Sequence, residues 1–319
     1  MLDSQPALGL VAPWLTLRDL FSVRRVSRKC CELLPHQTWH MAAEEISEET
    51  TVVRAAKAFP NIRHARLHLV TIQASSLEHG FRAWTQWQLS TLELSQIWNL
   101  TDAHLRLVTE NCPLLERLAV RQCYLLKTPT IVGPKLKYLS MENCLITKFQ
   151  DDTIWPDLEE LHVSSRVLAT LEARHLLKTL LARSQIQVLD LADCFMIEQI
   201  LIDPSDLPGL RTLNLRSCLG LKRVHLASGT VESIDLSLCV ELEVAILHLN
   251  QIRYLDLSYL QQLTSLHLGA KSIGLLNLRA CSQLVRANLV VTCPYITMTQ
   301  LEGTPLSLED LRGADVEMQ

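Results

Sequence analysis

One short pattern of apolar and polar positions returns along the chain every 21 to 28 residues. The pattern is Leu-x-x-Leu-x-Leu-x-x-Cys, and the six copies that carry the Cys begin at Leu115, Leu136, Ile186, Leu210, Val231 and Ile273. Weaker copies begin at Leu89, Leu158 and Ile252, and degenerate ones at Ile62 and Ile296. A fixed period in this range is typical of a stacked solenoid.

The spacing inside each copy predicts a strand. Leu213 and Leu215 are two residues apart, so they lie on the same face of a strand, and Cys218 turns back to the inside as the strand ends. Each coil therefore adds one strand to a parallel sheet and buries its leucines against the next coil. Burial of one Leu is worth roughly 1.5–3 kcal/mol, and no coil can bury its apolar face alone.

The return half of the coil differs along the chain. From Leu210 the period is 21, and a second phrase of the same form begins eleven residues later, at Leu221 and Leu263 and more weakly at Leu242 and Leu284. This leaves no room for a helix and predicts an extended back. Earlier returns are longer. Residues 101–111, with a Thr101-Asp102 start, and 168–182 have the leucine spacing of helices.

This pattern resembles the leucine-rich-repeat family, in its cysteine-containing class, over roughly residues 59–300. Residues 100–123 resemble it most, with a helix ending at Cys112-Pro113, and Cys293-Pro294 echoes that ending. The resemblance implies an α/β solenoid, a horseshoe or arc with a parallel β-sheet, preceded by a small helical segment. We expect the arc to flatten after about residue 210, where the backs become extended.

Residues 1–40 do not repeat, and they predict two short amphipathic helices broken near Pro35. Such a segment can simply cap the open end of the solenoid. It also resembles an F-box in Leu15, Asp19-Leu20, Val26, Ser27-Arg28 and Trp39, although the family's opening Leu-Pro is absent. The resemblance implies the substrate receptor of an SCF-type cullin–RING ubiquitin ligase. It places the adaptor contact on Leu15, Leu20, Val23, Val26, Leu34 and Trp39, which could instead form intramolecular core.

The strand positions between the leucines are predicted to face solvent and form the target-binding surface. Its candidate residues are Arg121, Tyr138, Glu142, His162, Asp190, Asn214, Arg216, Asp235, Tyr254, Asp256, Asn277 and Arg279. Tyr and Arg are enriched in protein interfaces, and the acids would favour a basic target segment. Alternatively, Asp and Asn are frequent at this position of leucine-rich repeats whatever the ligand.

The composition argues against nucleic acid and membrane as binding partners. The formal charge of −4 and pI near 6.3 give no basic footprint for nucleic acid. Mean hydropathy is +0.14, yet no apolar run reaches the roughly 20 residues of a membrane span, and Asp3 lies where a signal peptide has basic residues. Six of the ten cysteines share one repeat position. Their parallel side chains would not face each other, so we expect reduced thiols and a cytoplasmic or nuclear protein.

No motif for catalysis emerges. The chain lacks Gly-x-Gly-x-x-Gly, a Walker loop and Gly-x-Ser-x-Gly. Cys31, His36 and His40 lack a Cys-x-x-Cys pair, so no metal, cofactor or enzymatic activity is expected. The predicted organisation is an F-box-like segment (1–40), a linker and capping helix (41–61), about ten repeats (62–301) and a C-terminal cap or tail (302–319). The alternative to a ligase receptor is a leucine-rich-repeat scaffold.

Overall fold

The computed structural model describes residues 40–43, 63–68, 78, 81–82, 88–181 and 184–311. The chain divides into two compact units, Met1–Leu145 with Phe149–Leu158 (unit 1) and Ile146–Lys148 with Glu159–Gln319 (unit 2). Every strand pair within each unit is parallel, and consecutive coils contribute adjacent strands. The fold is therefore a leucine-rich-repeat-type α/β solenoid, as the spacing of the leucines predicts.

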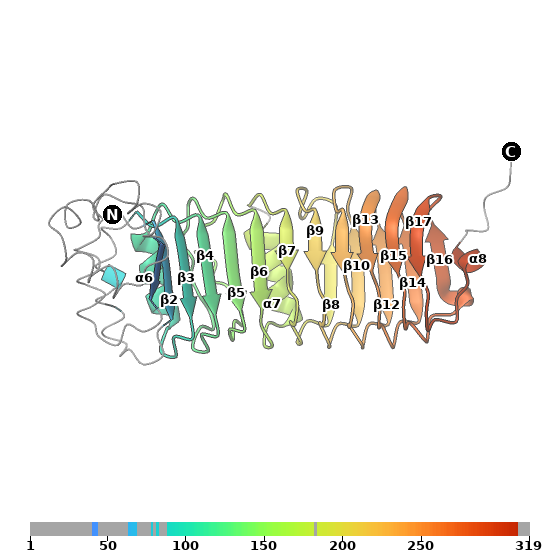
Figure 1. Cartoon of the computed structure of the whole chain (residues 1–319), viewed down its shortest axis with the longest axis horizontal. Coiled ribbons are helices and arrows are strands. Elements are labelled where there is room, and N and C mark those ends of the chain that lie inside the picture. Colours follow the sequence, from blue (N-terminus) through green and yellow to red (C-terminus); the bar gives the residue numbers. More distant parts are fainter. Residues whose placement is uncertain are drawn as a thin grey trace, which may run out of the picture. The chain divides into compact units, whose positions relative to one another are not determined.

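Unit 1 carries five strands of what we call the front sheet, each paired with the next along the chain (Figure 1). They are His40–Ala43 (β1), His64–His68 (β2), Thr91–Ser95 (β3), Arg117–Arg121 (β4) and Tyr138–Glu142 (β5). β1 lies across the predicted boundary between the F-box-like segment (1–40) and the linker and capping helix (41–61), and it pairs in register with β2. Its sequence, His-Met-Ala-Ala, lacks the leucine spacing by which the other strands are recognised.

The predicted helix of unit 1 is present. α6 spans Asp102–Asn111 and buries Leu105 and Val108. Thr101 begins it as expected: the Nδ1 of His104 lies 2.8 Å from the Thr101 hydroxyl and accepts the Thr101 backbone N–H at 3.2 Å. A side chain that satisfies a donor at a helix start stabilises the helix in the way of a capping box.

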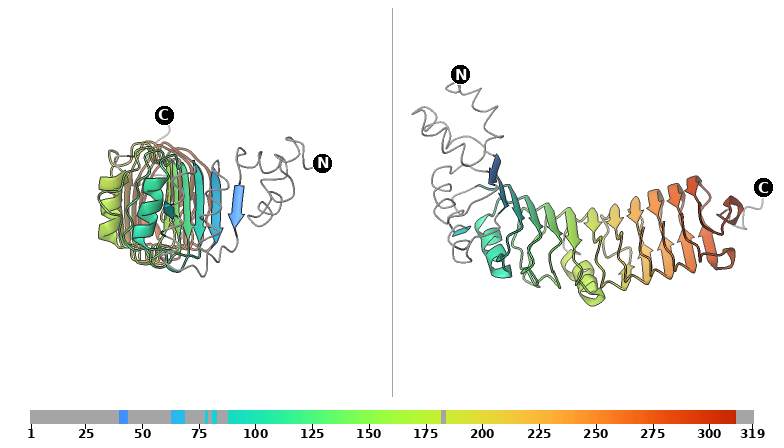
Figure 2. Two further views of the ribbon diagram at one scale, coloured as in Figure 1. Left: turned by 90° about the vertical axis from the view of Figure 1, so that its left-hand side faces the viewer. Right: turned by 60° about the horizontal axis from the view of Figure 1, so that its bottom comes forward.

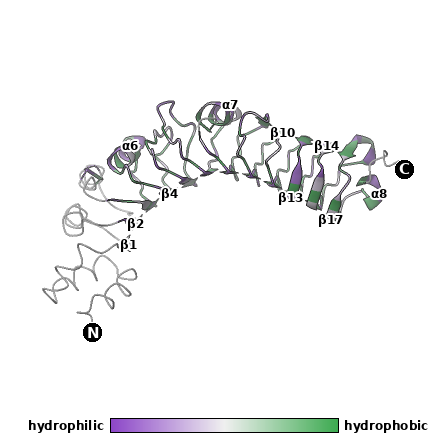
Figure 3. Ribbon diagram, turned by 90° about the horizontal axis from the view of Figure 1, so that it is seen from above, coloured by the Kyte–Doolittle hydropathy of each residue, from purple (hydrophilic) through white to green (hydrophobic). Residues whose placement is uncertain are grey.

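Unit 2 has two parallel layers, which Figure 3 shows from above with β13 and β17 in one and β10 and β14 in the other. The front-sheet strands are Glu160–Ser164 (β6), Val188–Asp190 (β7), Thr212–Asn214 (β9), Ser233–Asp235 (β11), Gln251–Asp256 (β13), Ser272–Asn277 (β15) and Ile296–Gln300 (β17). The back-sheet strands are Gln199–Ile202 (β8), Arg223–Ala227 (β10), Val244–His248 (β12), Ser265–Gly269 (β14) and Leu289–Thr292 (β16).

The second sheet confirms the prediction of extended backs after residue 210. Paired residues of β10, β12 and β14 are one 21-residue period apart, for example Val224, Ala245 and Leu266. β16 departs from this spacing, because Leu266 pairs with Leu289 and a short 3-10 helix, Arg286–Asn288 (η6), takes up two extra residues.

The second predicted helix lies in unit 2. Within the predicted range of 168–182 the structure has α7, Thr170–His175, which continues as one π-helical turn, Leu176–Leu180 (η4). It lies on the side of unit 2 away from the front sheet, next to β8 (Figure 2). Among the residues that the structure describes, no helix is both long and apolar enough to cross a membrane.

The core contains the repeated leucines and the cysteine ladder. The six ladder cysteines are buried and free: Cys123, Cys144, Cys194, Cys218, Cys239 and Cys281. Five of the thiols donate to a carbonyl of the preceding coil, as Cys218 does to Leu191 at 3.1 Å and Cys281 to Leu257 at 2.9 Å. The thiol therefore satisfies a carbonyl where a strand ends, in addition to filling core space.

The final coil is closed by residues that follow the repeats. The carbonyl of Glu302 accepts the N–H of Ala280, and Gly303 takes a left-handed φ of +75°. A short helix, Leu308–Leu311 (α8), follows and buries Leu311, and Leu306 is buried just before it. Residues 302–311 thus follow the last coil with two buried leucines, and residues 312–319 lie outside the described part of the chain.

Candidate protein-binding surface

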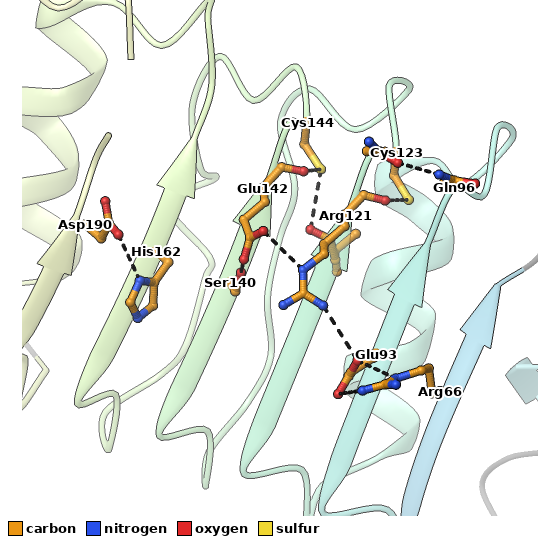
Figure 4. A network of polar contacts seen from close by, with 12 residues as sticks. Arg66, Glu93, Gln96, Arg121, Cys123, Ser140, Glu142, Cys144, His162 and Asp190 are labelled. Atoms are coloured by element: carbon orange, nitrogen blue, oxygen red, sulfur yellow. Dashed lines mark hydrogen bonds and ion pairs between the residues drawn. The ribbon is translucent and has the colours of Figure 1, made fainter. Parts of the chain in front are cut away.

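The outward face of the front sheet in unit 1 carries a ladder of alternating charges (Figure 4). Arg66 Nε lies 2.7 Å from Glu93 Oε2, Arg121 reaches the same carboxylate at 3.6 Å, and Arg121 Nε lies 3.1 Å from Glu142 Oε2. The strand register creates the ladder, since Glu93 pairs with Arg66 in β2, and Arg121 pairs with Glu142 in β5. A hydrogen bond to Glu93 raises the pKa of Arg66, and a hydrogen bond to Glu142 raises the pKa of Arg121, so both guanidinium groups stay charged.

The aromatic residue predicted for this face is held by a second arginine. The guanidinium of Arg117 lies 3.9 Å from the centroid of the Tyr138 ring, which is a cation–π contact. Beside it, the Ser140 hydroxyl donates to Glu142 at 2.7 Å. Arg121, Tyr138 and Glu142 are therefore brought together on adjacent strands, as the sequence predicts.

In unit 2 the first coils pair a histidine with an acid. His162 Nδ1 lies 3.2 Å from Asp190 Oδ2, and His162 Nε2 lies 3.7 Å from Glu160. The hydrogen bond to Asp190 raises the pKa of His162. Burial alone would raise the pKa of Asp190, but hydrogen bonds from His162 and the Ala192 backbone hold it below its ordinary value. The pair favours imidazolium next to carboxylate.

The acidic-amide row that was predicted to contact a target has a structural use. Each of its five side chains accepts the backbone N–H two residues ahead, at 2.8–3.2 Å: Asp190, Asn214, Asp235, Asp256 and Asn277. The next residue in each coil takes a left-handed φ between 56° and 63°. Asp and Asn favour such local bonds at turns, so the row ends five strands in the same way. This contact uses Oδ1 of Asp190, Asp235 and Asp256, so the turn engages one carboxylate oxygen of each.

Two members of the row are buried, which corrects the prediction that they face solvent. Asp256 is 7% exposed and Asn277 is 8% exposed. The Asn277 amide donates to both carboxylate oxygens of Asp256 at 3.1 Å, and the Tyr254 hydroxyl donates to Asp256 at 2.5 Å. The side chains of neighbouring coils thus cover each other. Asp256 raises the pKa of Tyr254 to about 12 through this hydrogen bond.

The remaining predicted residues are solvent-accessible. Arg216 and Arg279 are exposed, Asn214 and Asp235 are partly exposed, and Arg279 Nε lies 2.9 Å from Glu302. The predicted adaptor contacts, Leu15, Leu20, Val23, Val26, Leu34 and Trp39, lie outside the described residues. The described part of the chain contains no cluster of three or more His, Cys, Asp or Glu side chains that could bind a metal ion.

Several charged residues of the face were not predicted as binding residues. Arg66 belongs to the ladder, Arg117 to the stack on Tyr138, and Glu93, which the strand pattern places facing outward, joins Arg66 to Arg121. A second ladder of Arg211, Glu232 and Arg253 lies at the beginnings of the front strands in unit 2. Each of these residues occupies a repeat position that faces outward, so a comparison of equivalent positions coil by coil would have found them.

Comparisons with family models, curated proteins and solved structures gave the following results. No protein-family model matches the chain, and no curated protein matches its sequence. Among solved structures, a chain from the "Crystal structure of TLR13-ssRNA13 complex" is 16% identical over 89% of this chain, with a TM-score of 0.48. The present chain spans about half of that protein's length, since the match covers 46% of it.

Proposed function

We propose that this protein is a non-catalytic recognition subunit that binds a partner protein with the front sheet of its solenoid. One observation carries the proposal: strands in register hold arginine, glutamate and tyrosine side chains at fixed spacing on an outward face, as in the Arg66–Glu93–Arg121–Glu142 ladder. Side chains that are ordered before binding lose little entropy on association. Arg and Tyr are also the residues most enriched at binding hot spots.

Arg121 and Tyr138 give the test of this face. The wild-type chain should capture a partner protein from a cell extract. The single variants Arg121→Gln and Tyr138→Ala should each fail to capture it, because each removes a side chain that would contact the partner. It should be retained with Arg223→Gln, which removes an exposed arginine from the back sheet. Quantitative mass spectrometry of the captured proteins provides the readout. Equal capture by all four chains would contradict recognition by the front sheet.

The F-box resemblance makes the proposal more specific. A protein with an F-box ahead of leucine-rich repeats would act as the substrate receptor of an SCF-type cullin–RING ubiquitin ligase. The N-terminal segment would bind the adaptor subunit, and through it a cullin, while the solenoid holds the target. The support is the order of Leu15, Asp19-Leu20, Val26, Ser27-Arg28 and Trp39 in the sequence.

Co-purification with a recombinant adaptor subunit tests this role. The wild-type chain should give a stoichiometric complex, and the double variant Leu20→Asp, Val26→Asp should not, because a charge on the apolar helix face opposes burial in the interface. A folded wild-type chain without adaptor would rule out the receptor role and leave the scaffold as the function.

The scaffold alternative makes a different prediction for stability. If residues 1–40 only cap the solenoid, Leu20 is part of the intramolecular core, and Leu20→Asp should lower the free energy of unfolding by several kcal/mol. If the segment is an F-box, the same variant should abolish adaptor binding with little loss of stability. Chemical denaturation of the variant distinguishes the two.

A further inference from the structure

The second charge ladder lies beside an open groove of about 670 Å³ in unit 2. The groove follows the beginnings of β11, β13 and β15 and the turns that precede them. Arg211, Glu232 and Arg253 line it together with Gly209, Gly229 and Gly274. All three glycines lack a Cβ, so the groove stays open between charged side chains. The lining therefore has two cations and one anion.

One carboxylate serves both arginines. Glu232 Oε1 lies 2.6 Å from Arg211, and Glu232 Oε2 lies 3.0 Å from Arg253 Nε. The Arg253 side chain is 84% exposed, and Glu232 is the one acid that pairs with it among the described residues. A guanidinium has five N–H donors, and the Glu232 contact uses its Nε edge. Arg253 can therefore bind a second carboxylate.

The ladder ends where a further acid would be expected. In unit 1, Arg121 lies between two carboxylates, Glu93 and Glu142, contributed by the coils before and after it. Arg253 has Glu232 in the coil before it, but the coil after it has Gly274, between the register pairs Ile252–Ile273 and Tyr254–Leu275. A Cβ at Gly274 would lie 2.6 Å from the carbonyl oxygen of Arg253. The close approach of the two coils thus excludes a side chain from this place.

We propose that the groove binds an acidic peptide segment of the partner protein, whose Asp or Glu carboxylate approaches from solvent and pairs with the exposed guanidinium of Arg253, to which the coil at Gly274 offers no carboxylate of its own. Guanidinium and carboxylate match in a two-bond geometry, and the excess positive charge of the groove favours an anionic segment. The inference rests on the proposed function and adds the chemistry of the target. It replaces the basic segment that the acidic-amide row suggested.

A fluorescein-labelled hexaglutamate peptide tests the groove on the full-length chain by fluorescence anisotropy. The wild-type chain should bind it, a hexaglutamine peptide should not, and binding should weaken as salt is raised. Arg253→Gln should weaken binding at least tenfold. Arg223→Gln, which removes the same charge from the back sheet, should change it less than twofold. Arg253 is mostly exposed, so circular dichroism should show both variants folded.

Three outcomes would overturn the proposal. These are no binding of hexaglutamate, an equal loss with Arg253→Gln and Arg223→Gln, or competition by a phosphoserine peptide at concentrations far below those of the glutamate peptide. The last result would mean that the groove selects phosphate over carboxylate. The peptide assay does not involve Arg121 or Tyr138. A negative result here, with capture that still depends on those two residues, would reject the acidic segment and leave partner binding in place.

Discussion

At the scale of single residues, the Asp and Asn side chains of one repeat position are partly exposed in some coils and buried in others. The alternation of leucines predicts which positions face outward, and Asp190 to Asn277 do lie at those positions. Burial of Asp256 and Asn277 was not predictable from that alternation, because it accompanies the contact of Asn277 with Asp256 of the preceding coil and the contact of Tyr254 with Asp256 inside β13. The sequence of one coil contains no information on what its neighbours place beside it.

Asp256→Asn should destabilise the protein at neutral pH. Burial alone would raise the pKa of Asp256, but hydrogen bonds from Ser258, Tyr254 and Asn277 outweigh burial and hold that pKa below its ordinary value of 3.8. Loss of the charged acceptor should lower the free energy of unfolding by roughly 1–3 kcal/mol. Urea denaturation at pH 7 measures it.

The same network predicts a pH dependence. Because the folded state holds the pKa of Asp256 below its unfolded value, the carboxylate contributes stability that is present above about pH 4 and is lost as pH falls through the lower, folded pKa. Wild-type stability should fall more than that of Asp256→Asn between pH 5 and pH 3. A constant difference between the two chains over this range would contradict the network.

The ladder thiols should be chemically inert in the folded protein. Burial raises the pKa of Cys194, Cys239 and Cys281 to about 12, and the thiolate is the form that reacts. Iodoacetamide at pH 8 should label the half-buried Cys293 well before any of them, and urea should make all of them reactive. Peptide mass spectrometry separates the sites. Fast labelling of Cys239 without denaturant would contradict the ladder.

At the scale of the element, the coil is predictable where its period is regular and less so elsewhere. The leucine phrases predict the strands of both sheets from residue 210, and the helices at 101–111 and 168–182. They do not predict β1, whose sequence lacks the phrase, nor the two-residue offset of β16, which depends on the 3-10 helix at Arg286–Asn288. The ion pairs of the charge ladders were not predicted, because each pair joins residues of two different coils.

Glycine substitutions report how closely neighbouring coils approach. A Cβ at Gly220 would lie 2.4 Å from the carbonyl oxygen of Phe195, whereas a Cβ at Gly229 meets nothing within 4 Å. Gly220→Ala should therefore cost about 1–3 kcal/mol of stability, because the backbone must shift. Gly229→Ala should be neutral or stabilise by up to about 1 kcal/mol. Thermal denaturation of the two variants provides the comparison, and equal melting temperatures would refute the close approach.

At the scale of the whole molecule, the repeat should tolerate loss of a complete coil. Residues 252–272 form one 21-residue period in both sheets of unit 2. Their deletion places Ile273 where Ile252 was, and Asn277 next to Asp235, so strand pairing is conserved. The shortened chain should fold and unfold cooperatively in urea. Deletion of 252–271 leaves one residue in excess where Gln251 meets Ser272, so the strand that follows must bulge or shift its register by one residue. Its urea midpoint should therefore be lower than that of the 21-residue deletion.

The constant 21-residue register from β9 to β15 allows such a protein to gain or lose whole repeats by recombination. A recombination event between neighbouring repeats can have its breakpoints anywhere in the coil, provided that they are one period apart, because each position then meets its own equivalent. The chain can therefore lengthen or shorten by one coil while the side-chain contacts between neighbouring coils stay the same. The coil that ends at β17 marks where this freedom ends. The pairs Leu266–Leu289 and Ile273–Ile296 are both 23 residues apart, so a 21-residue exchange across this coil would leave both layers two residues out of register.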